Sequence, residues 1–432
     1  MYEFVEREDK EIFDALAGEE RREAEGLELI PSENYVSRAV REASGSVMTN
    51  KYSEGYPGKR YYGGQEFTDQ VETLAIERAK KLFKADHANV QPLSGSPMNM
   101  AVYLALCKPG DTIMGMDLSH GGHLTHGHPV SHMGKLFNFV RYKTLPEEEG
   151  RIDFDELLRL AKEHKPKILL CGYTSYPRDY KYEDFKKVAD EVGAYTMADI
   201  AHIGGLVAGG VMANPFDAGF DIVTTTTHKT LRGPRGGMIL SKGTVGNPLK
   251  EPEFIKTNLP TILDRSVFPG LQGGPHMQTI AATAVALHEA AQPKFKEYAQ
   301  QILLNAKALA DELMKRGTKL VTNGTSNHMM VVDCVASWNL KGGEVEKILD
   351  SVGITTNKSM IPDDSNPPFS PSGLRLGTPA MTTRGFKEKE CRQVANWIVE
   401  AIENRADTTA LAKIHNGVKA LCAAFPIPDS FI

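Results

Sequence analysis

A regular alternation of short apolar segments with amphipathic helical segments is the feature that most constrains the fold of this chain. The apolar segments lie at residues 136–142, 167–173 and 194–198, and a run of β-branched residues lies at 222–226. Branched or aromatic residues in such runs favour strands. Helical spacing occupies 154–164 and 182–192 between them. Strands that alternate with helices predict a mostly parallel sheet buried on both faces, and therefore an α/β fold.

The last third of the chain has shorter and more segregated elements. Helical spacing at 295–316 and about 342–351, strands at 328–334 and 373–376, and a last pair of helices predict a separate α+β domain. We expect an N-terminal arm over residues 1–50, which begins with charged helical sequence, a large domain over 51–284 and a small domain over 285–432. Residues 241–268 are predicted to be a loop region.

Composition excludes several classes of protein. The net charge of −5 gives no reason to expect nucleic acid or an anionic membrane as a partner. No run of 18 apolar residues exists, so no transmembrane helix is expected. The cysteines are scattered without a CxxC pair, which argues against disulfides or structural zinc and indicates a cytoplasmic location. They are Cys107, Cys171, Cys334, Cys391 and Cys422.

Polar and reactive residues follow the ends of the predicted strands. In a parallel sheet the carboxyl ends of the strands form the edge that binds ligands. Asp199 and Lys229 at successive strand ends suit pyridoxal phosphate, because a carboxylate keeps the pyridine nitrogen protonated and a lysine holds the aldehyde. Most lysines are solvated, but the hydroxyl, histidine and glycine neighbours of Lys229 reverse that expectation. The strand-end residues are Thr174, Asp199, His202, Thr226, His228 and Lys229.

Two glycine-containing turns could bind a phosphate. The segment 94–97, Ser-Gly-Ser-Pro, lies between a predicted strand and a helix, where free backbone N–H groups attract anions. A second turn at 269–275 contains Gly273 and Gly274 and is either a plain start of a helix or a second set of donors. GxGxxG and GxxxxGK[ST] motifs are absent from the sequence, which argues against dinucleotide and P-loop sites.

Three further stretches carry candidate site residues. Five histidines between His120 and His132 fit no zinc spacing, so one ring stacked on a flat cofactor is the better interpretation. Arg375 lies on a short strand between two glycines and could clamp a carboxylate, or could be a surface residue. The tyrosine-rich segment 50–64 reads as a binding loop, and Glu54, its one carboxylate, is a candidate for proton transfer.

These motifs together closely resemble the serine hydroxymethyltransferases, a family of fold-type-I pyridoxal-phosphate enzymes. The resemblance extends from about Leu27 to the C-terminal helices. It implies a large domain with a mostly parallel seven-stranded sheet and a smaller α+β C-terminal domain. The motifs that carry it are SENY at 32–35, NKYSEGYPGKRYYGG at 50–64, SGSP at 94–97, HGGHLTHG at 120–127, DIAHIGGLVAGG at 199–210, VTTTTHKTLRGPRGG at 223–237 and LRLGTPA at 374–380.

The resemblance also implies roles for individual residues. Lys229 would bind the cofactor covalently, Asp199 would pair with the pyridine nitrogen, and His123 would stack on the ring. Thr174 and His202 would lie near the phenolic oxygen. The phosphate would be held by Ser94, Gly95, Ser96 and His228, with Gly273 and Gly274 of a partner subunit. Ser32 and Arg375 would bind the amino acid carboxylate, and Tyr52, Glu54 and Tyr62 would enter from the partner of a homodimer. The residues expected to act in catalysis are Lys229, Glu54, His228, Asp199 and Thr226.

The reaction implied is transfer of the hydroxymethyl carbon of serine to tetrahydrofolate, which gives glycine and methylenetetrahydrofolate. The chain departs from the usual family pattern at Leu93 (usually His), Gly205 (usually Ala), Ser359 (often Asn) and in the segment 177–182. An enzyme for α-methylserine or a modified pterin, a folate-independent aldolase for β-hydroxy amino acids, and a catalytically silent scaffold therefore stay open as alternatives.

Overall fold

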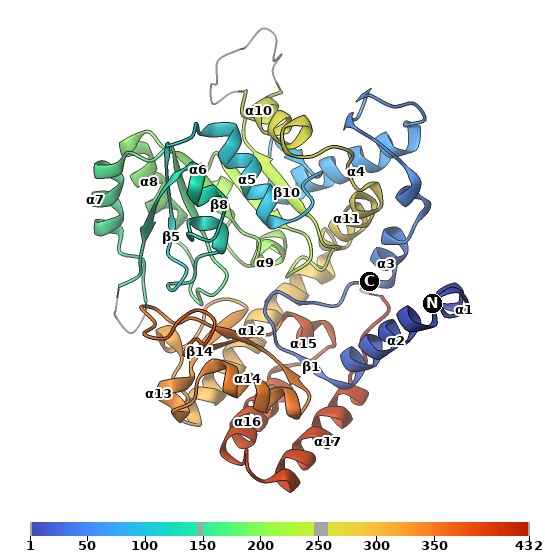
Figure 1. Cartoon of the computed structure of the whole chain (residues 1–432), viewed down its shortest axis with the longest axis vertical. Helices are drawn as coiled ribbons and strands as arrows, with labels where there is room; N and C mark the ends of the chain where they lie inside the picture. The colour runs from blue at the N-terminus through green and yellow to red at the C-terminus, as the bar shows by residue number, and fades with distance from the viewer. Residues whose placement is uncertain (1, 146–149, 246–257, 431–432) are drawn as a thin grey trace.

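The computed structural model describes residues 2–145, 150–245 and 258–430. Figure 1 shows a sheet with its helices in the upper part of the view and a mainly helical group, coloured orange to red, below it. The long helix α12 (Pro293–Lys315) runs between the two parts. Its first half contributes Phe295 and Tyr298 to the apolar core around the sheet, and its second half contributes Leu309 and Leu313 to the lower core.

A seven-stranded sheet has the order β4-β10-β9-β8-β7-β5-β6. All neighbouring pairs from β9 to β6 are parallel, whereas β10 is antiparallel to both of its neighbours. This confirms the predicted mostly parallel sheet. The strands are β4 (His87–Asn89), β5 (Thr112–Met116), β6 (Asn138–Tyr142), β7 (Ile168–Gly172), β8 (Tyr195–Asp199), β9 (Ile222–Thr226) and β10 (Gly237–Ser241).

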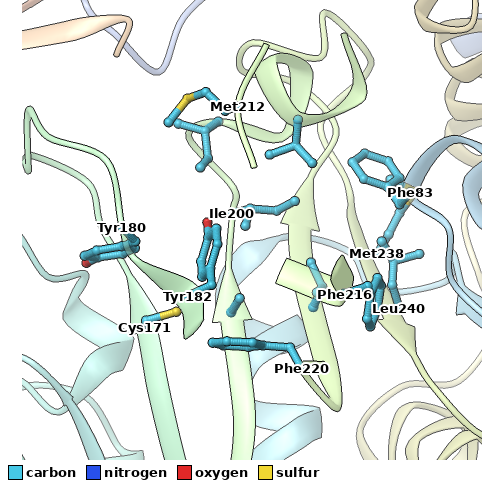
Figure 2. Close-up of a cluster of buried hydrophobic side chains, with 14 of the residues drawn as sticks. Phe83, Cys171, Tyr180, Tyr182, Ile200, Met212, Phe216, Phe220, Met238 and Leu240 are labelled. Atoms are coloured by element: carbon cyan, nitrogen blue, oxygen red, sulfur yellow. The ribbon is translucent and has the colours of Figure 1, made fainter. Parts of the chain in front are cut away.

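Both faces of this sheet are covered, because alternate residues of each strand point to opposite sides. On β7, Leu169 and Cys171 join one apolar cluster, whereas Ile168 and Leu170 join another. Figure 2 shows part of the first cluster, in which Cys171 lies among aromatic rings that include Phe220. Helices that contribute to the first cluster are α4 (Glu66–Phe83), α7 (Phe154–His164), α8 (Tyr182–Val192) and α11 (Met277–Ala290), and those on the second are α5 (Gly95–Leu106), α6 (Met133–Leu136) and α10 (Leu259–Arg265).

Most predicted elements agree with these bounds, but one prediction is wrong. The expected helices at 154–164 and 182–192 are α7 and α8, and Asp153 caps α7 by accepting a hydrogen bond from the backbone N of Glu156 at 3.0 Å. The segment 241–268 is not wholly a loop, since α10 and the helical turn Ser266–Leu271 lie in its described part. Apolar side chains such as Leu259 and Leu263 pack that helix onto the sheet. Residues 246–257 lie outside the described residues.

The lower part contains the three-stranded antiparallel sheet β11-β14-β13. Its apolar core also includes Leu27 and Leu29 from the N-terminal segment, where β1 pairs with β12. The division into arm, large domain and small domain stays a prediction. The elements are β11 (Met329–Asp333), β12 (Ile354–Thr355), β13 (Asn357–Ser359), β14 (Gly373–Gly377), α13 (Cys334–Trp338), α14 (Gly342–Ser351), α15 (Pro379–Thr383), α16 (Glu388–Glu403) and α17 (Thr408–Ala424).

The N-terminal segment is helical, as its charged pattern predicts. It forms α1 (Glu3–Glu8), α2 (Lys10–Glu25), β1 (Leu27–Glu28) and α3 (Arg38–Ser44), and α2 lies beside α17, where Lys419 pairs with Glu25 at 2.8 Å. The tyrosine-rich segment forms a small hairpin of β2 (Gly55–Tyr56) and β3 (Lys59–Arg60). In the described part of the chain we find no helix with the length and apolarity needed to cross a membrane.

Candidate active site

A cavity of about 690 Å³ lies at the carboxyl edge of the sheet, between the strand ends and β13 and β14. Residues that follow β5, β7, β8 and β9 line one side of it, and residues of the β13–β14 region line the other. Eleven residues expected from the sequence line this single cavity, although the chain brings them from seven separate segments. They are Ser32, Ser94, Gly95, Ser96, His123, Thr174, His202, Thr226, His228, Lys229 and Arg375.

Lys229 lies just beyond β9, where the backbone is held in place by other segments. Its carbonyl oxygen accepts hydrogen bonds from Asn34 Nδ2 and from the backbone N of Arg232, both at 3.1 Å. Burial lowers the pKa of Lys229 to about 8; the charge of Asp199 opposes this shift and that of Arg375 adds to it. A lysine with this pKa is partly uncharged near neutral pH, which is the form that attacks a carbonyl carbon.

Asp199 lies at the end of β8 and is held by three donors. Its Oδ2 accepts hydrogen bonds from Asn99 Nδ2 at 2.8 Å and from His126 Nε2 at 3.0 Å, and its Oδ1 accepts one from the backbone N of Ala201 at 3.0 Å. Burial by itself would raise the pKa of Asp199, but the hydrogen bonds from His126 and Asn99 oppose that effect, and the pKa stays below its ordinary value. The carboxylate therefore stays ionised and could hold a protonated ring nitrogen.

Hydrogen bonds also settle the tautomer of His126, which lies beside His123. The Nδ1 atom of His126 accepts a hydrogen bond from the backbone N of His123 at 3.1 Å, so its proton is on Nε2, which faces Asp199. Burial lowers the pKa of His123 to about 4, and its uncharged ring lines the cavity. Within the described ranges we find no group of three or more His, Cys, Asp or Glu residues placed to bind a metal ion.

The start of helix α5 faces the same cavity as His228. Ser94 is the N-cap residue of α5 but its side chain makes no capping hydrogen bond, and Gly95 and Ser96 are the first helical residues. The Nδ1 atom of His228 is buried and has no hydrogen-bond partner among the described residues. Free backbone N–H groups at a helix start, two hydroxyls and an unpartnered imidazole nitrogen fit a phosphate group.

Arg375 lies on β14 of the small sheet, and its side chain reaches Thr174, which follows β7 of the large sheet. Its Nη1 donates to the carbonyl oxygen of Thr174 at 2.5 Å, and its Nε donates to Asn357 Oδ1 at 3.1 Å. Burial lowers the pKa of Arg375 to about 10, and Glu33 opposes that shift, so the guanidinium is charged at neutral pH. A guanidinium with Ser32 in the same cavity fits a carboxylate ligand.

The remaining five predicted residues gather elsewhere on this chain. Tyr52 Oη lies 3.4 Å from Glu54 Oε1, and the rings of Tyr52 and Tyr62 are 4.9 Å apart between centroids. Gly274 lies against the Tyr52 ring, since a methyl group on it would be 3.0 Å from that ring, and one on Gly273 would be 3.1 Å from the Glu54 carboxylate. These residues, here called the tyrosine–glycine cluster, are not among the residues that line the cavity.

Three residues that are not among the predicted site residues contact residues of the site. Asn99 and His126 hold Asp199, and His328 lies against His202 with 3.2 Å between His328 Nε2 and His202 Nδ1. Asn99 could have been noticed, because it is an amide inside an otherwise apolar helix. His328 precedes β11 and gives no comparable signal, because its significance depends on the packing of the two parts of the chain.

A mostly parallel α/β sheet with a lysine and a carboxylate at its carboxyl edge is the architecture of the fold-type-I pyridoxal-phosphate enzymes. Comparison with known proteins defines the family. A profile of the serine hydroxymethyltransferase family matches residues 5–398, and the chain belongs to that family.

Three curated relatives, each named serine hydroxymethyltransferase, match this chain over nearly their whole length. The protein from Koribacter versatilis is 52% identical over 427 residues, which cover 99% of this chain and 96% of the relative. The protein from Xanthomonas campestris is 52% identical over 98% of this chain and 98% of the relative. The protein from Crocosphaera subtropica is 53% identical over 98% of this chain and 96% of the relative. These matches confirm the predicted family, fold class and enzyme class, a hydroxymethyltransferase. The roles of individual residues stay predictions.

Proposed function

We propose that this chain transfers the hydroxymethyl carbon of serine to tetrahydrofolate, with pyridoxal phosphate bound covalently at Lys229. The observation that carries the proposal is the presence in one cavity of Lys229, with its pKa lowered to about 8, and the charged Arg375. The cofactor supplies an electron sink that makes cleavage next to the amino acid α-carbon possible.

The predicted residues in and beside the cavity each have a task in this proposal. Lys229 attacks as the free amine, and its neighbour Asp199 keeps a proton on the ring nitrogen. Arg375 and Ser32 orient serine by its carboxylate. The uncharged His123 covers the ring, and Thr174, His202 and Thr226 line the cavity around it. Ser94, Gly95, Ser96 and His228, which line the same cavity, would hold the phosphate.

The tyrosine–glycine cluster completes the site of a second copy of this chain in our proposal. Tyr52 and Tyr62 are about half exposed and Tyr61 is 76% exposed, so an aromatic surface is available to a partner. In a homodimer, Glu54 would then manage protons in the partner's cavity, and Gly273 and Gly274 would add backbone donors to the phosphate. A cytoplasmic location stays a prediction; all five cysteines are free and buried.

The first experiment measures glycine formation from serine with and without tetrahydrofolate. We expect the reaction to need the pterin, and Lys229→Ala to abolish turnover and the visible absorbance of the bound cofactor. An equal rate without the pterin would replace the proposal by a folate-independent aldolase, and a strong preference for α-methylserine would change the substrate. Absence of any cofactor absorbance would indicate a silent scaffold.

A second experiment tests the shared site by mixing two inactive variants, Lys229→Ala and Glu54→Gln. If each site uses residues of both subunits, a mixed dimer has one site with both residues intact. Random reassociation of equal amounts should then restore about a quarter of the wild-type activity. A mixture that stays inactive after reassociation, as judged by mass spectrometry of mixed dimers, would show that each chain supplies its own Glu54.

A further inference from the structure

Two buried histidines meet where the two parts of the chain pack together. His202 follows β8 and lines the cavity, whereas His328 precedes β11 and is not among the lining residues. Their side chains approach with 3.2 Å between His202 Nδ1 and His328 Nε2, and their relative exposures are 2% and 0%. The backbone oxygen of His202 accepts a hydrogen bond from Thr230 Oγ1 at 3.0 Å, and that of His328 accepts one from the backbone N of Thr378 at 3.1 Å.

Both rings are uncharged at neutral pH. Burial lowers the pKa of each, and the positive charges of Lys229 and Arg375 add to this effect, which brings the pKa of His328 to about 3. Two neutral imidazoles at hydrogen-bonding distance share a single proton between the facing nitrogens, so one ring donates and the other accepts.

The other nitrogen of His328 decides which ring donates. Its Nδ1 atom is buried and has no hydrogen-bond partner among the described residues. A proton on that atom would leave an N–H group unpaired in the protein interior, which is rarer than an unpaired acceptor. The proton of His328 therefore belongs on Nε2, and His202 Nδ1 accepts it.

We propose that His328 is a positioning residue that fixes His202 as the Nε2–H tautomer, so that His202 acts in the cavity as a hydrogen-bond donor. A neutral imidazole has one N–H group, and when Nδ1 accepts, that group must be Nε2–H. The group that His202 recognises is then an acceptor, and an anionic oxygen suits it best. If the proposed function holds, on which this step rests, the oxygen is the phenolic oxygen of pyridoxal phosphate.

The tautomer can be measured without the cofactor or catalysis. Nitrogen-15 NMR of the cofactor-free, histidine-labelled protein distinguishes a protonated from an unprotonated ring nitrogen, and the His202→Gln variant assigns the signal of His202. We expect Nε2–H on His202 in the wild type and in His328→Gln, whose side-chain amide can still donate. In His328→Leu we expect a mixture of tautomers. Nδ1–H on His202 in the wild type would overturn the inference.

The loaded protein provides a second measurement. If His202 donates to the phenolic oxygen, losing the fixed tautomer should raise by about one unit the pH at which the absorbance of the bound cofactor changes. The shift should appear in His328→Leu and be mostly reversed in His328→Gln; equal shifts in both would indicate a merely structural role.

The outcomes distinguish this inference from the proposed function. If His202 is the Nε2–H tautomer in the wild type but the protein binds no cofactor, only the proposed function is refuted. If His202 is the Nδ1–H tautomer and the protein has full pterin-dependent activity, only this inference is refuted.

Discussion

Replacement of Arg60 by methionine should destabilise the protein strongly, because it breaks a buried ion pair. The Arg60 side chain is 3% exposed; its Nη2 lies 2.5 Å from Glu72 Oε2 and its Nε lies 2.8 Å from Asp69 Oδ1. Removing one partner of a fully buried pair costs about 3–5 kcal/mol, because the other charge is left without compensation. The pair with the more exposed Asp69 adds at most about 1 kcal/mol. We therefore expect the free energy of unfolding, from urea titration at pH 7, to fall by about 4 kcal/mol.

The pH dependence distinguishes this explanation from a simple loss of packing. Burial raises the pKa of Glu72 even in the wild type, while Arg60 opposes the shift, so the variant should raise the pKa further. A carboxyl group whose pKa is higher in the folded state favours folding at low pH, and this contribution is lost as the pH rises through the folded-state pKa. The difference in stability between variant and wild type should therefore shrink as the pH falls from 7 towards 5.

A matched double variant provides the control. Adding Glu72→Gln to Arg60→Met removes the unpaired charge and keeps an oxygen for Gln91, whose Nε2 donates to Glu72 Oε1 at 2.7 Å. The double variant should therefore be more stable than Arg60→Met alone. A loss below about 1 kcal/mol, a loss that does not change with pH, or a double variant as unstable as the single one would refute the reasoning.

The same substitution should impair catalysis through the hairpin. Nη1 of Arg60 donates to the carbonyl oxygens of Ser53 and Gly55, both at 2.9 Å, so it holds the backbone on both sides of Glu54. Under the proposed function, pterin-dependent turnover should fall in the variant while the affinity for the cofactor changes little.

The remaining predictions concern three single positions. Arg384→Leu should lower the free energy of unfolding by about 3 kcal/mol in a urea titration, because Arg384 donates to five carbonyl oxygens near the ends of α2 and α17. The control Arg316→Leu, at an ion pair whose side chains are 29% and 53% exposed, should cost less than about 1 kcal/mol in the same titration. The rate at which cofactor-free protein captures pyridoxal phosphate should rise with pH around 8 rather than 10.5, since the pKa of Lys229 is about 8; a rate that still rises steeply above pH 9 would contradict that value. The folded state should likewise gain stability as the pH rises from 8 to 10.5, where only the unfolded chain still binds this proton. Arg375→Lys should raise the KM for serine about 100-fold with a smaller effect on kcat, because lysine cannot make the two-pronged contact; an unchanged KM would remove Arg375 from the substrate site.

Sequence periodicity predicts the strands that carry the site better than the rest of the sheet. Strand β7 is a continuous apolar run, β8 is mostly apolar and β9 is a run of branched residues. Polar residues follow each of them, so both their type and their reactive ends can be read directly. Strand β5 is harder to recognise in the sequence because Gly115 interrupts its apolar run. Tertiary structure explains the glycine, since a methyl group at that position would lie 2.6 Å from the backbone oxygen of His126. Strand β10 starts inside a run of glycines, where no strand signal exists.

The site residues also divide into those that the sequence predicts and those that depend on tertiary packing. The strand-end residues can be listed from the sequence, because the topology of a parallel sheet gathers its carboxyl ends. His328 cannot, since its contact with His202 spans 126 residues and arises only when the small sheet packs on the large one. The tyrosine–glycine cluster shows a different limit, because its residues are close together in one chain and yet lie outside that chain's cavity.

The departures from the usual family pattern become easier to interpret with the structure in hand. Gly205 fits a close contact, since a methyl group on it would lie 2.2 Å from the backbone oxygen of Thr230, just after Lys229. In the segment 177–182, the rings of Tyr180 and Tyr182 are buried in the apolar core of the large sheet, as Figure 2 shows.

Leu93 is 39% exposed and is not among the residues that line the cavity, whereas Ser359 does line it. The Ser359 hydroxyl donates to the backbone oxygen of Met360 at 3.2 Å, from the strand next to Arg375. Of the single-residue departures, Ser359 is therefore the one placed to touch a substrate. The cavity residues assigned to the phosphate and to Lys229 chemistry match the family pattern. A change of specificity in this chain should therefore concern the pterin of the proposed function and leave the lysine chemistry as it is.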